Sequence, residues 1–428
     1  MQMPALSRRF VGVVSLAIVA SSAVAAEQWS RFRGPNGSAV SDASNLPEKW
    51  NDETNLRWKT TLPGPGSSSP IIVGDRVFIT CYSGYGDASG GSDVKNLRRH
   101  LICAALSDGK ILWVRETPGV AGEDRFSGFL RDHGYATSTP ASDGQSVFVF
   151  YGKSGVLAYD LEGKELWKAN VGSGSAKNNW GSGSSPVLFG DLVIVNAAAE
   201  GKAVIALNKQ TGKQEWRSEA PNIYGSWSTP VLVEVPGGKT ELVLSAPYEL
   251  WGFDPANGNF LWYADGIADD TICGSVVARD GIVYAVGGRG GSAVAVRAGG
   301  RDDATQKQTV WKKQLSSYVP SPVLFGDRIF SVNERGVLGC LAARDGTSIF
   351  QKRLPDAGGV YASPVVADSK LFIVTRRNGT IVVSTSESGE VLSHNKFADD
   401  TDFNASPAIG DGIILLRSNK SLYCIATK

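Results

Sequence analysis

The sequence is dominated by one short pattern that returns along most of its length. Its fullest copy is the segment 206–216, Ala-Leu-Asn-Lys-Gln-Thr-Gly-Lys-Gln-Glu-Trp. In this segment an apolar strand ends, an Asn and a Thr-Gly pair make a turn, and a second strand closes on tryptophan. Degenerate copies occupy the segments 105–113, 158–167, 252–262, 340–350 and 383–393. Turn chemistry that recurs with a period of roughly forty residues predicts a repeat architecture.

A second signal has the same period. Ser-Ser-Pro or a variant of it precedes an apolar run and a Gly-Asp turn, as in the segment 184–191. The residues that open these apolar runs number eight: Pro70, Pro140, Pro186, Pro230, Val276, Pro322, Pro364 and Pro407. The first interval is longer than the others because it carries two polar insertions, 82–100 and 115–135. Loops of this length inside a compact array are usually functional or disordered.

The repeated pattern resembles the tryptophan-docking motif of the pyrroloquinoline-quinone (PQQ)-like β-propeller repeat. Residues 206–216 match the motif Ala-x-Asp/Asn-x-x-Thr-Gly-x-x-x-Trp at every defined position. The resemblance implies an all-β fold, an eight-bladed β-propeller of four-stranded antiparallel blades, in which each tryptophan stacks between neighbouring blades. The tryptophans expected in this structural role are Trp58, Trp113, Trp167, Trp216, Trp262 and Trp311.

The two ends of the chain complement each other. The strand at 56–60 carries Trp58 but lacks the three strands that should precede it, and the residues 406–426 supply three strands without a tryptophan. Pairing of these N- and C-terminal strands closes the ring and removes free sheet edges. We therefore expect residues 56–428 to form a single propeller. Residues 27–55 are expected to be a strap across the outside of the ring, with Trp29 and Phe32 in surface grooves.

Residues 1–26 have the features of a signal peptide. Arg8 and Arg9 precede an apolar run that is too short to span a bilayer, and an Ala-x-Ala site predicts cleavage near Ala25 or Ala26. We expect an exported protein, periplasmic or secreted, that is monomeric and has no membrane span. The net charge of +1 falls to about −1 without the two leader arginines, which gives no electrostatic reason to expect a nucleic-acid partner.

Five cysteines are spread irregularly along the chain, at Cys81, Cys103, Cys273, Cys340 and Cys424. The odd count and the spacing exclude a disulfide framework and a Cys-x-x-Cys metal site. Three of them, Cys103, Cys340 and Cys424, occupy the same apolar strand position in different repeats, where a buried small side chain is expected. Cys81 and Cys103 lie on expected neighbouring strands, so a disulfide and a pair of free thiols both stay open.

The loops that lead into the innermost strands should gather around the central channel on one face. They differ from one another in sequence and combine aromatic, amide, carboxylate and hydroxyl groups, which suits a binding surface; the alternative is that they only plug the channel. The candidate ligand-binding residues are Arg131, Asp132, His133, Asn179, Trp180, Tyr224 and Trp227. Later lead-in loops contribute Tyr318 and Tyr361. The pairs Asp269-Asp270 and Asp399-Asp400 are interpreted as turn carboxylates, and no catalytic or metal-binding residue is predicted.

The resemblance implies two kinds of function, because the PQQ-like propeller occurs in quinone enzymes and in non-catalytic bacterial proteins. Quinoproteins are expected to have a Trp floor under the cofactor, and calcium bound by Glu, Asn and Asp. Here only Trp180 with Asn178 and Asn179 is similar to such a floor. The chain also resembles the lipoprotein propeller of outer-membrane barrel assembly, although no Cys lies near its cleavage site.

We therefore favour an exported, non-catalytic propeller that binds a protein, peptide or glycan through its channel-mouth loops and needs no cofactor. Two alternatives are a PQQ- and calcium-dependent dehydrogenase and a carbohydrate-binding or carbohydrate-processing propeller. The processing function would need paired carboxylates across the channel mouth.

Overall fold

The structure is a computed structural model that describes residues 29–87 and 91–427 of the chain. The expected signal peptide and its cleavage site lie outside the described residues. No helix in the described ranges is long and apolar enough for a membrane crossing.

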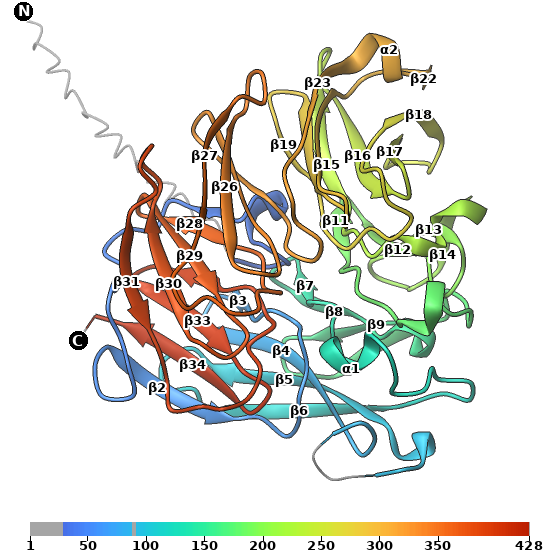
Figure 1. Ribbon diagram of the computed structural model, residues 1–428. Coiled ribbons are helices and arrows are strands. Elements are labelled where there is room, and N and C mark those ends of the chain that lie inside the picture. Colours follow the sequence, from blue (N-terminus) through green and yellow to red (C-terminus); the bar gives the residue numbers. More distant parts are fainter. Residues whose placement is uncertain (1–28, 88–90, 428) are drawn as a thin grey trace, which may run out of the picture.

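Eight antiparallel sheets of four strands stand around a common axis and form the blades of a propeller, as the sequence predicted (Figure 1). Blade 1 consists of β3 (Ile71–Val73), β4 (Arg76–Ser83), β5 (Arg98–Ala105) and β6 (Ile111–Pro118), and blade 2 of β7 (Ala141–Ser142), β8 (Ser146–Phe150), β9 (Val156–Asp160) and β10 (Glu165–Ala169). Blade 3 consists of β11 (Val187–Phe189), β12 (Leu192–Ala197), β13 (Ala203–Asn208) and β14 (Gln214–Glu219), and blade 4 of β15 (Val231–Val235), β16 (Lys239–Ala246), β17 (Glu249–Phe253) and β18 (Phe260–Asp265).

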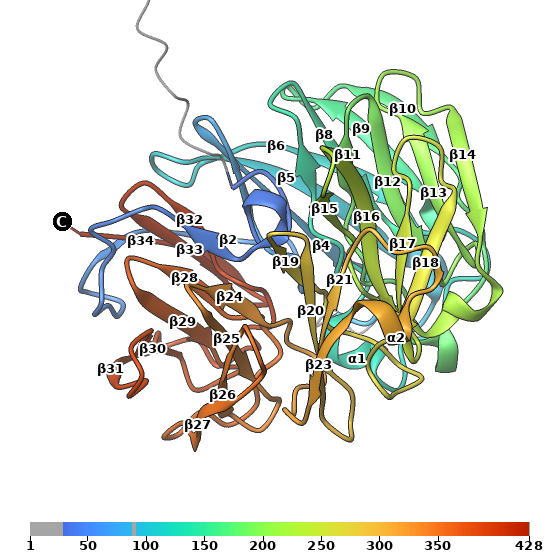
Figure 2. The same cartoon turned by 90° about the horizontal axis from the view of Figure 1, so that it is seen from above.

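The remaining blades complete the ring (Figure 2). Blade 5 consists of β19 (Val277–Arg279), β20 (Ile282–Gly287), β21 (Ser292–Arg297) and β23 (Thr309–Lys313), and blade 6 of β24 (Val323–Phe325), β25 (Arg328–Val332), β26 (Val337–Ala342) and β27 (Ser348–Arg353). Blade 7 consists of β28 (Val365–Ala367), β29 (Lys370–Val374), β30 (Thr380–Ser384) and β31 (Val391–Asn395), and blade 8 of β32 (Ala408–Gly410), β33 (Ile413–Arg417), β34 (Ser421–Ala426) and β2 (Leu56–Thr61). Antiparallel pairing of β2 with β34 confirms the predicted closure.

The other elements are short. Two strands extend existing blades in parallel, β1 (Val40–Ser41) beside β28 and β22 (Asp302–Asp303) beside β18. The helical turns among the described residues are α1 (Leu130–His133), α2 (Thr305–Gln308), η1 (Pro35–Gly37), η2 (Val94–Asn96), η3 (Gly152–Ser154), η4 (Lys177–Asn179) and η5 (Pro221–Gly225). The core therefore lies between blades and not between helices and a sheet.

The repeated motif joins each blade to the next. In blade 3, Ala206 lies directly opposite Trp216, so the indole has room above its own sheet. The Trp216 ring then covers Gly258 in the turn between the third and fourth strands of blade 4, where a Cβ would lie 2.4 Å from the ring. Its Nε1 donates a hydrogen bond to the carbonyl of Pro255, 3.1 Å away. The alanine, the turn glycine and the tryptophan of the motif are thus parts of one contact.

Trp262 is an exception among the docking tryptophans. The connection that precedes β23 in blade 5 has no Thr-Gly turn, and the side-chain Nε1 of Trp262 donates instead to Glu241 in its own blade, 2.7 Å away. Glu241 also accepts hydrogen bonds from Gly299 N and Arg301 Nη1 in that connection. In blade 4 a buried carboxylate therefore accepts the indole hydrogen bond, whereas the other docking tryptophans donate to a backbone carbonyl.

Cys81 and Cys103 do not form a disulfide. Cys103 lies opposite Phe78 on β4, and Cys81 is three residues further along that strand, opposite His100. Because successive side chains of a strand point to opposite faces, the two thiols lie on opposite sides of blade 1. The expectation that Cys103, Cys340 and Cys424 share one buried strand position is confirmed, since each lies opposite a docking tryptophan or Phe350.

The Ser-Pro signal marks a belt of hydrogen bonds around the channel. In blades 2 to 8, a Ser or Thr lies just before the inner strand. Its hydroxyl oxygen accepts a hydrogen bond from the backbone N–H of the Ser or Thr at the same position in the preceding blade, at 2.9–3.0 Å. The members in order are Ser69, Thr139, Ser185, Thr229, Ser275, Ser321, Ser363 and Ser406. The link from Ser406 back to Ser69 is missing, and at this seam Arg417 of blade 8 donates to Ser68 Oγ and Thr80 O of blade 1. The hydroxyls satisfy buried backbone donors that no strand pairs.

The expectation that Trp29 and Phe32 lie in surface grooves is wrong, although part of the strap does lie on the outside of the ring. Glu48 O and Trp50 N–H both bond to Asn395 of β31, the outer strand of blade 7. Residues 29–41 instead cross the floor face, which carries the turns between first and second strands. Trp29 O and Ser30 O accept hydrogen bonds from blades 1 and 2, and Asn36 reaches blade 4. Trp29 is buried against Gly34, and Phe32 lines the channel. A positive φ of 65° at Gly34 makes the tight turn that folds the strap across the channel.

Replacement of Trp216 by alanine should lower the free energy of unfolding by about 3–5 kcal/mol, because it removes a buried indole and leaves a cavity between blades 3 and 4. Chemical denaturation of the purified protein measures this change. Trp251→Ala is the matched control, since Trp251 is only partly buried and contacts no docking glycine. Equal losses for both variants would contradict the docking role.

Candidate functional site

The mouth face lies opposite the strap and carries the lead-in loops together with the hairpins between second and third strands. Its centre is filled by Phe129, which immediately precedes α1 in the second insertion. The Phe129 ring lies 5.2 Å from Trp180, 5.7 Å from Tyr361 and 6.3 Å from Tyr318, measured between ring centroids. The loops that carry Trp180, Tyr318 and Tyr361 therefore all contact the Phe129 ring of the second insertion.

His133 ends α1 and is held by two hydrogen bonds. Its Nε2 donates to the carbonyl of Trp180 at 2.8 Å, and its Nδ1 accepts from the Thr137 hydroxyl at 2.7 Å. The ring lines the cavity of the channel, and burial lowers the pKa of His133 from 6.5 to about 4. The imidazole is thus neutral at physiological pH and fixes the second insertion to the Trp180 loop.

Two arginines on hairpins extend the aromatic cluster outwards. Arg289, between β20 and β21, lies over the ring of Tyr318 at 4.3 Å and over Trp180 at 5.8 Å. Arg376, which follows β29, lies over Tyr361 at 4.4 Å. A guanidinium over an aromatic face is attracted by the ring quadrupole. The Arg289 side chain is 52% exposed and the Arg376 side chain 21% exposed, so both guanidinium groups are accessible from this face.

The aspartates of the mouth are engaged by these arginines. Asp132 lies 3.1 Å from Arg376, and Asp402 lies 2.8 Å from the same guanidinium and 2.6 Å from Arg377. Asp269 accepts from the backbone N–H of Arg289 at 2.7 Å, which helps to lower its pKa against the raising effect of burial. Within residues 29–87 and 91–427, no three His, Cys, Asp or Glu side chains gather closely enough to hold a metal ion.

The seven candidate residues lie on loops of this one face, at different distances from its centre. His133, Trp180 and Trp227 adjoin the centre, and the two indoles are 5.6 Å apart. Trp227 Nε1 also donates to Gly181 O at 2.8 Å. Asp132 is engaged with Arg376, as described above, and the remaining three lie further out: Arg131, Asn179 and Tyr224.

The outer candidates are more exposed. The Tyr224 side chain is 41% exposed and lies beneath Lys177, whose Nζ is 6.0 Å from the ring centroid. Arg131 Nε donates to Phe126 O at 3.3 Å. Asn179 has a φ of 56°, which turns the chain of η4 before Trp180. These three residues form a rim around the central aromatic cluster.

Sequence reasoning missed Phe129, Arg289 and Arg376. The glycine-rich segment Gly287–Gly291 forms a tight hairpin between β20 and β21. A usable signal was available, because Arg289 and Arg376 both occupy the hairpin between the second and third strands of their blades. Those hairpins end on the same face as the lead-in loops.

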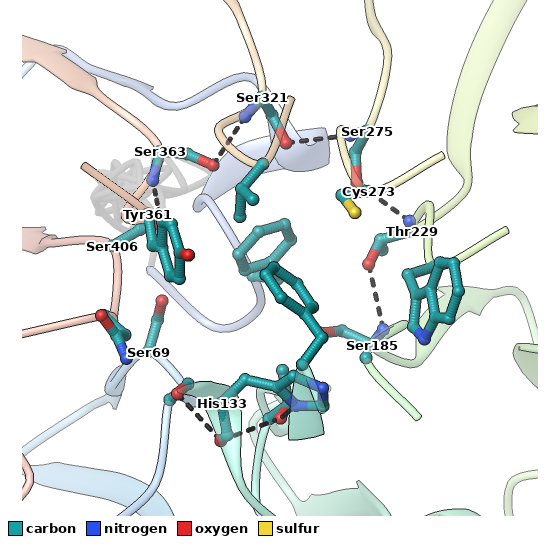
Figure 3. Close-up of a pocket in the computed structure, with 18 residues that line it drawn as sticks. Ser69, His133, Ser185, Thr229, Cys273, Ser275, Ser321, Tyr361, Ser363 and Ser406 are labelled. Atoms are coloured by element: carbon teal, nitrogen blue, oxygen red, sulfur yellow. Dashed lines mark hydrogen bonds between the residues drawn. The ribbon is translucent and has the colours of Figure 1, made fainter. Parts of the chain in front are cut away.

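Beneath Phe129 the channel contains a cavity of about 120 Å³, and Phe32 of the strap also lines it. The labelled Ser and Thr residues of the belt surround this space (Figure 3). Cys273 lies in its wall, and burial raises the pKa of that thiol to about 12, which makes it a poor nucleophile at neutral pH.

Two buried ion pairs fix the second insertion that carries Phe129. Arg99 lies 2.7 Å from Glu123, and Lys153 lies 3.0 Å from Asp124, with all four side chains at most one-tenth exposed. Lys153 belongs to η3 of blade 2 and Arg99 to β5 of blade 1. These ion pairs therefore anchor the second insertion to blades 1 and 2.

Residues 98–352, more than half of the chain, match the model of a PQQ-like family described as outer membrane protein assembly factor BamB. The chain belongs to this BamB family. A curated relative, the outer membrane protein assembly factor BamB of Burkholderia pseudomallei (strain K96243), is 26% identical over 371 residues, which cover 74% of this chain and 84% of the relative.

Solved structures with low sequence identity share the fold. BamB from Moraxella catarrhalis superposes with a TM-score of 0.62 at 15% identity, covering 86% of this chain and 96% of that one. A europium-containing methanol dehydrogenase gives 0.65 at 12% identity, covering 94% and 98%. The second likeness raises the question whether this mouth suits a quinone cofactor.

The residues of the mouth do not fit PQQ with a bound cation. Trp180, the one residue similar to a quinoprotein floor, is surrounded by Phe129, Trp227 and Arg289. The aspartates of the mouth, which are the available carboxylate ligands for a cation, are engaged by guanidinium groups. A cation placed among these arginines would be repelled by them.

The depressed pKa of His133 makes a pH-dependent contribution to stability. Between about pH 6.5 and pH 4 the unfolded chain binds a proton at this position that the folded chain does not, so folding weakens as the pH falls through this window. His133→Gln lacks this contribution. The free energy of unfolding of the wild type, relative to that of His133→Gln, should therefore fall by about 2 kcal/mol from pH 7 to pH 4.

Urea denaturation across the pH range checks this expectation. His394→Gln is the control, because His394 is exposed and far along the chain from the mouth insertion. Parallel pH profiles for the wild type and His133→Gln would show that His133 titrates freely.

Proposed function

We propose that the protein is an exported, non-catalytic binding propeller whose mouth face holds a segment of a partner protein. The observation that carries this proposal is the cluster around Phe129, in which aromatic rings from several lead-in loops are bordered by stacked arginines. Aromatic residues and arginine are the residue types most enriched at energetically important positions of protein interfaces.

The construction of the mouth supports binding better than catalysis. Asp132, Asp269 and Asp402 are each engaged by an arginine, so they do not supply the acid and base of a glycosidase. His133 has both ring nitrogens committed to structural hydrogen bonds. Rigid aromatic side chains on fixed loops lose little conformational entropy when a partner binds.

Membership of the BamB family supports a protein partner over a glycan. The curated relative is described as an outer membrane protein assembly factor. By this analogy the chain acts outside the cytoplasm, in the periplasm, on a protein component of the cell envelope. The leader expected in residues 1–26 agrees with this location.

Site-specific photo-crosslinking tests the proposal. A crosslinking amino acid at position 224, on the mouth rim, should capture a defined partner from the exported protein fraction, whereas one at the exposed position 260 on the outer strand β18 should not. With the captured partner purified, Trp180→Ala and Arg289→Ala should each weaken its binding at least about tenfold.

The controls separate binding from folding and from quinone chemistry. Phe260→Ala should bind the partner normally, because Phe260 is exposed on the outer strand β18 and contacts none of the mouth residues described above. Crosslinks at position 260 alone would contradict the mouth site. A change in absorbance on addition of PQQ and calcium, with dye-linked oxidation of alcohols, would contradict the non-catalytic assignment.

A further inference from the structure

The strap carries a buried guanidinium that has no anionic partner. The Arg33 side chain is 1% exposed, and its one hydrogen-bond partner among the described residues is the carbonyl of Pro322 in blade 6, which Nη2 contacts. Its Nε and Nη1 atoms are buried without a partner, and no carboxylate of the described residues lies within ion-pair distance. Arginine stays protonated in proteins, so this is an unneutralised buried charge.

Such a charge is costly unless something compensates it. Burial of an ionised group without a counter-charge is strongly unfavourable, and each unpaired N–H of a charged donor adds to the cost. Consistent with this, burial alone lowers the pKa of Arg33 to about 9, with no neighbouring acid to oppose the shift. Arg417, the other fully buried arginine of the channel wall, differs because its guanidinium donates to oxygens of Ser68 and Thr80.

A small cavity adjoins Arg33. It has a volume of about 10 Å³ and lies between the strap and the inner ends of blades 3, 4 and 5, where Thr229 and Ser275 also line it. These two belt hydroxyls accept hydrogen bonds from backbone N–H groups, and their own hydrogens have no acceptor among residues 29–87 and 91–427. Each hydroxyl therefore has one O–H that can be donated into the cavity.

We propose that this cavity holds a single small anion, of the size of chloride, between the Arg33 guanidinium and the hydroxyls of Thr229 and Ser275. The volume is that of about one water molecule, which excludes sulfate, phosphate and larger carboxylates. The polar side chains that line the cavity are those of Arg31, Arg33, Thr229 and Ser275, which supply N–H and O–H donors and no carboxylate. Water alone would satisfy the donors but would leave the charge.

The anion would join the strap to the ring. Arg33 belongs to the strap, whereas Thr229 and Ser275 belong to the lead-in residues of blades 4 and 5. An ion bound by all three residues links the strap to blades 4 and 5. Without the ion, the Arg33 side chain is joined to the ring only through its hydrogen bond to the Pro322 carbonyl. The site is separate from the mouth face, and the inference does not depend on the proposed partner.

Chloride NMR with the intact exported protein tests the proposal. Addition of wild-type protein should broaden the ³⁵Cl resonance of a dilute chloride solution, and bromide should reverse the excess broadening by competition. Arg33→Met should remove most of the excess broadening. Arg344→Met is the matched control, since it makes the same change of charge at a side chain that is 86% exposed, and it should behave as the wild type.

Diffraction from wild-type crystals grown in bromide decides the outcome if Arg33→Met does not fold. The expected result is an anomalous peak in contact with the Arg33 guanidinium and the Thr229 and Ser275 hydroxyls. An ordered water without anomalous signal at that position would overturn the proposal. Equal chloride broadening by Arg33→Met and the wild type would overturn it as well.

Discussion

The structure depends on one contact repeated around the ring, the docking of an indole from one blade onto a glycine turn of the next. Gly258 shows why the contact cannot be replaced by ordinary packing, since no side chain fits between that residue and Trp216. At the channel, neighbouring blades are joined by the belt of Ser and Thr hydroxyls. The docking contact fastens the outer strands and the belt fastens the inner ends, with exceptions at Trp262 and at the seam between blades 8 and 1. The irregular loops can then vary without cost to the ring.

The fold was predictable because this contact leaves a local imprint. A small residue, a turn glycine and a tryptophan stand at fixed spacing in the chain, although the tryptophan and the glycine that meet belong to different repeats. The closure by β2 followed from counting strands. The sequence places Cys81 and Cys103 on neighbouring strands but does not give the register between those strands. Whether the two cysteines form a disulfide could therefore not be decided from the sequence, whereas the observed register puts the two thiols on opposite faces of the sheet.

The candidate site was predictable only in outline. Loops that lead into inner strands must share a face, and this placed His133, Trp180 and Trp227 together. The position of Phe129 depends on how an insertion folds back, and that is set by ion pairs between residues distant in sequence, such as Lys153 and Asp124. The sequence predicts that Trp29 and Phe32 lie in surface grooves. In the structure Trp29 is buried against Gly34, and Phe32 lines the channel.

The contacts of the strap also determine when folding of the protein can be completed. Residues 29–41 are synthesised before the blades, but their partners include Pro322 and Val366 in blades 6 and 7. The strand β2 likewise waits for β34 at the other end of the chain. Such contacts join segments hundreds of residues apart, and topologies of this kind fold slowly because loop closure precedes the gain from contact. Residues 29–41 remain available to chaperones and proteases until the last blades have been synthesised, and a chain truncated before those blades lacks the partners that would bury them.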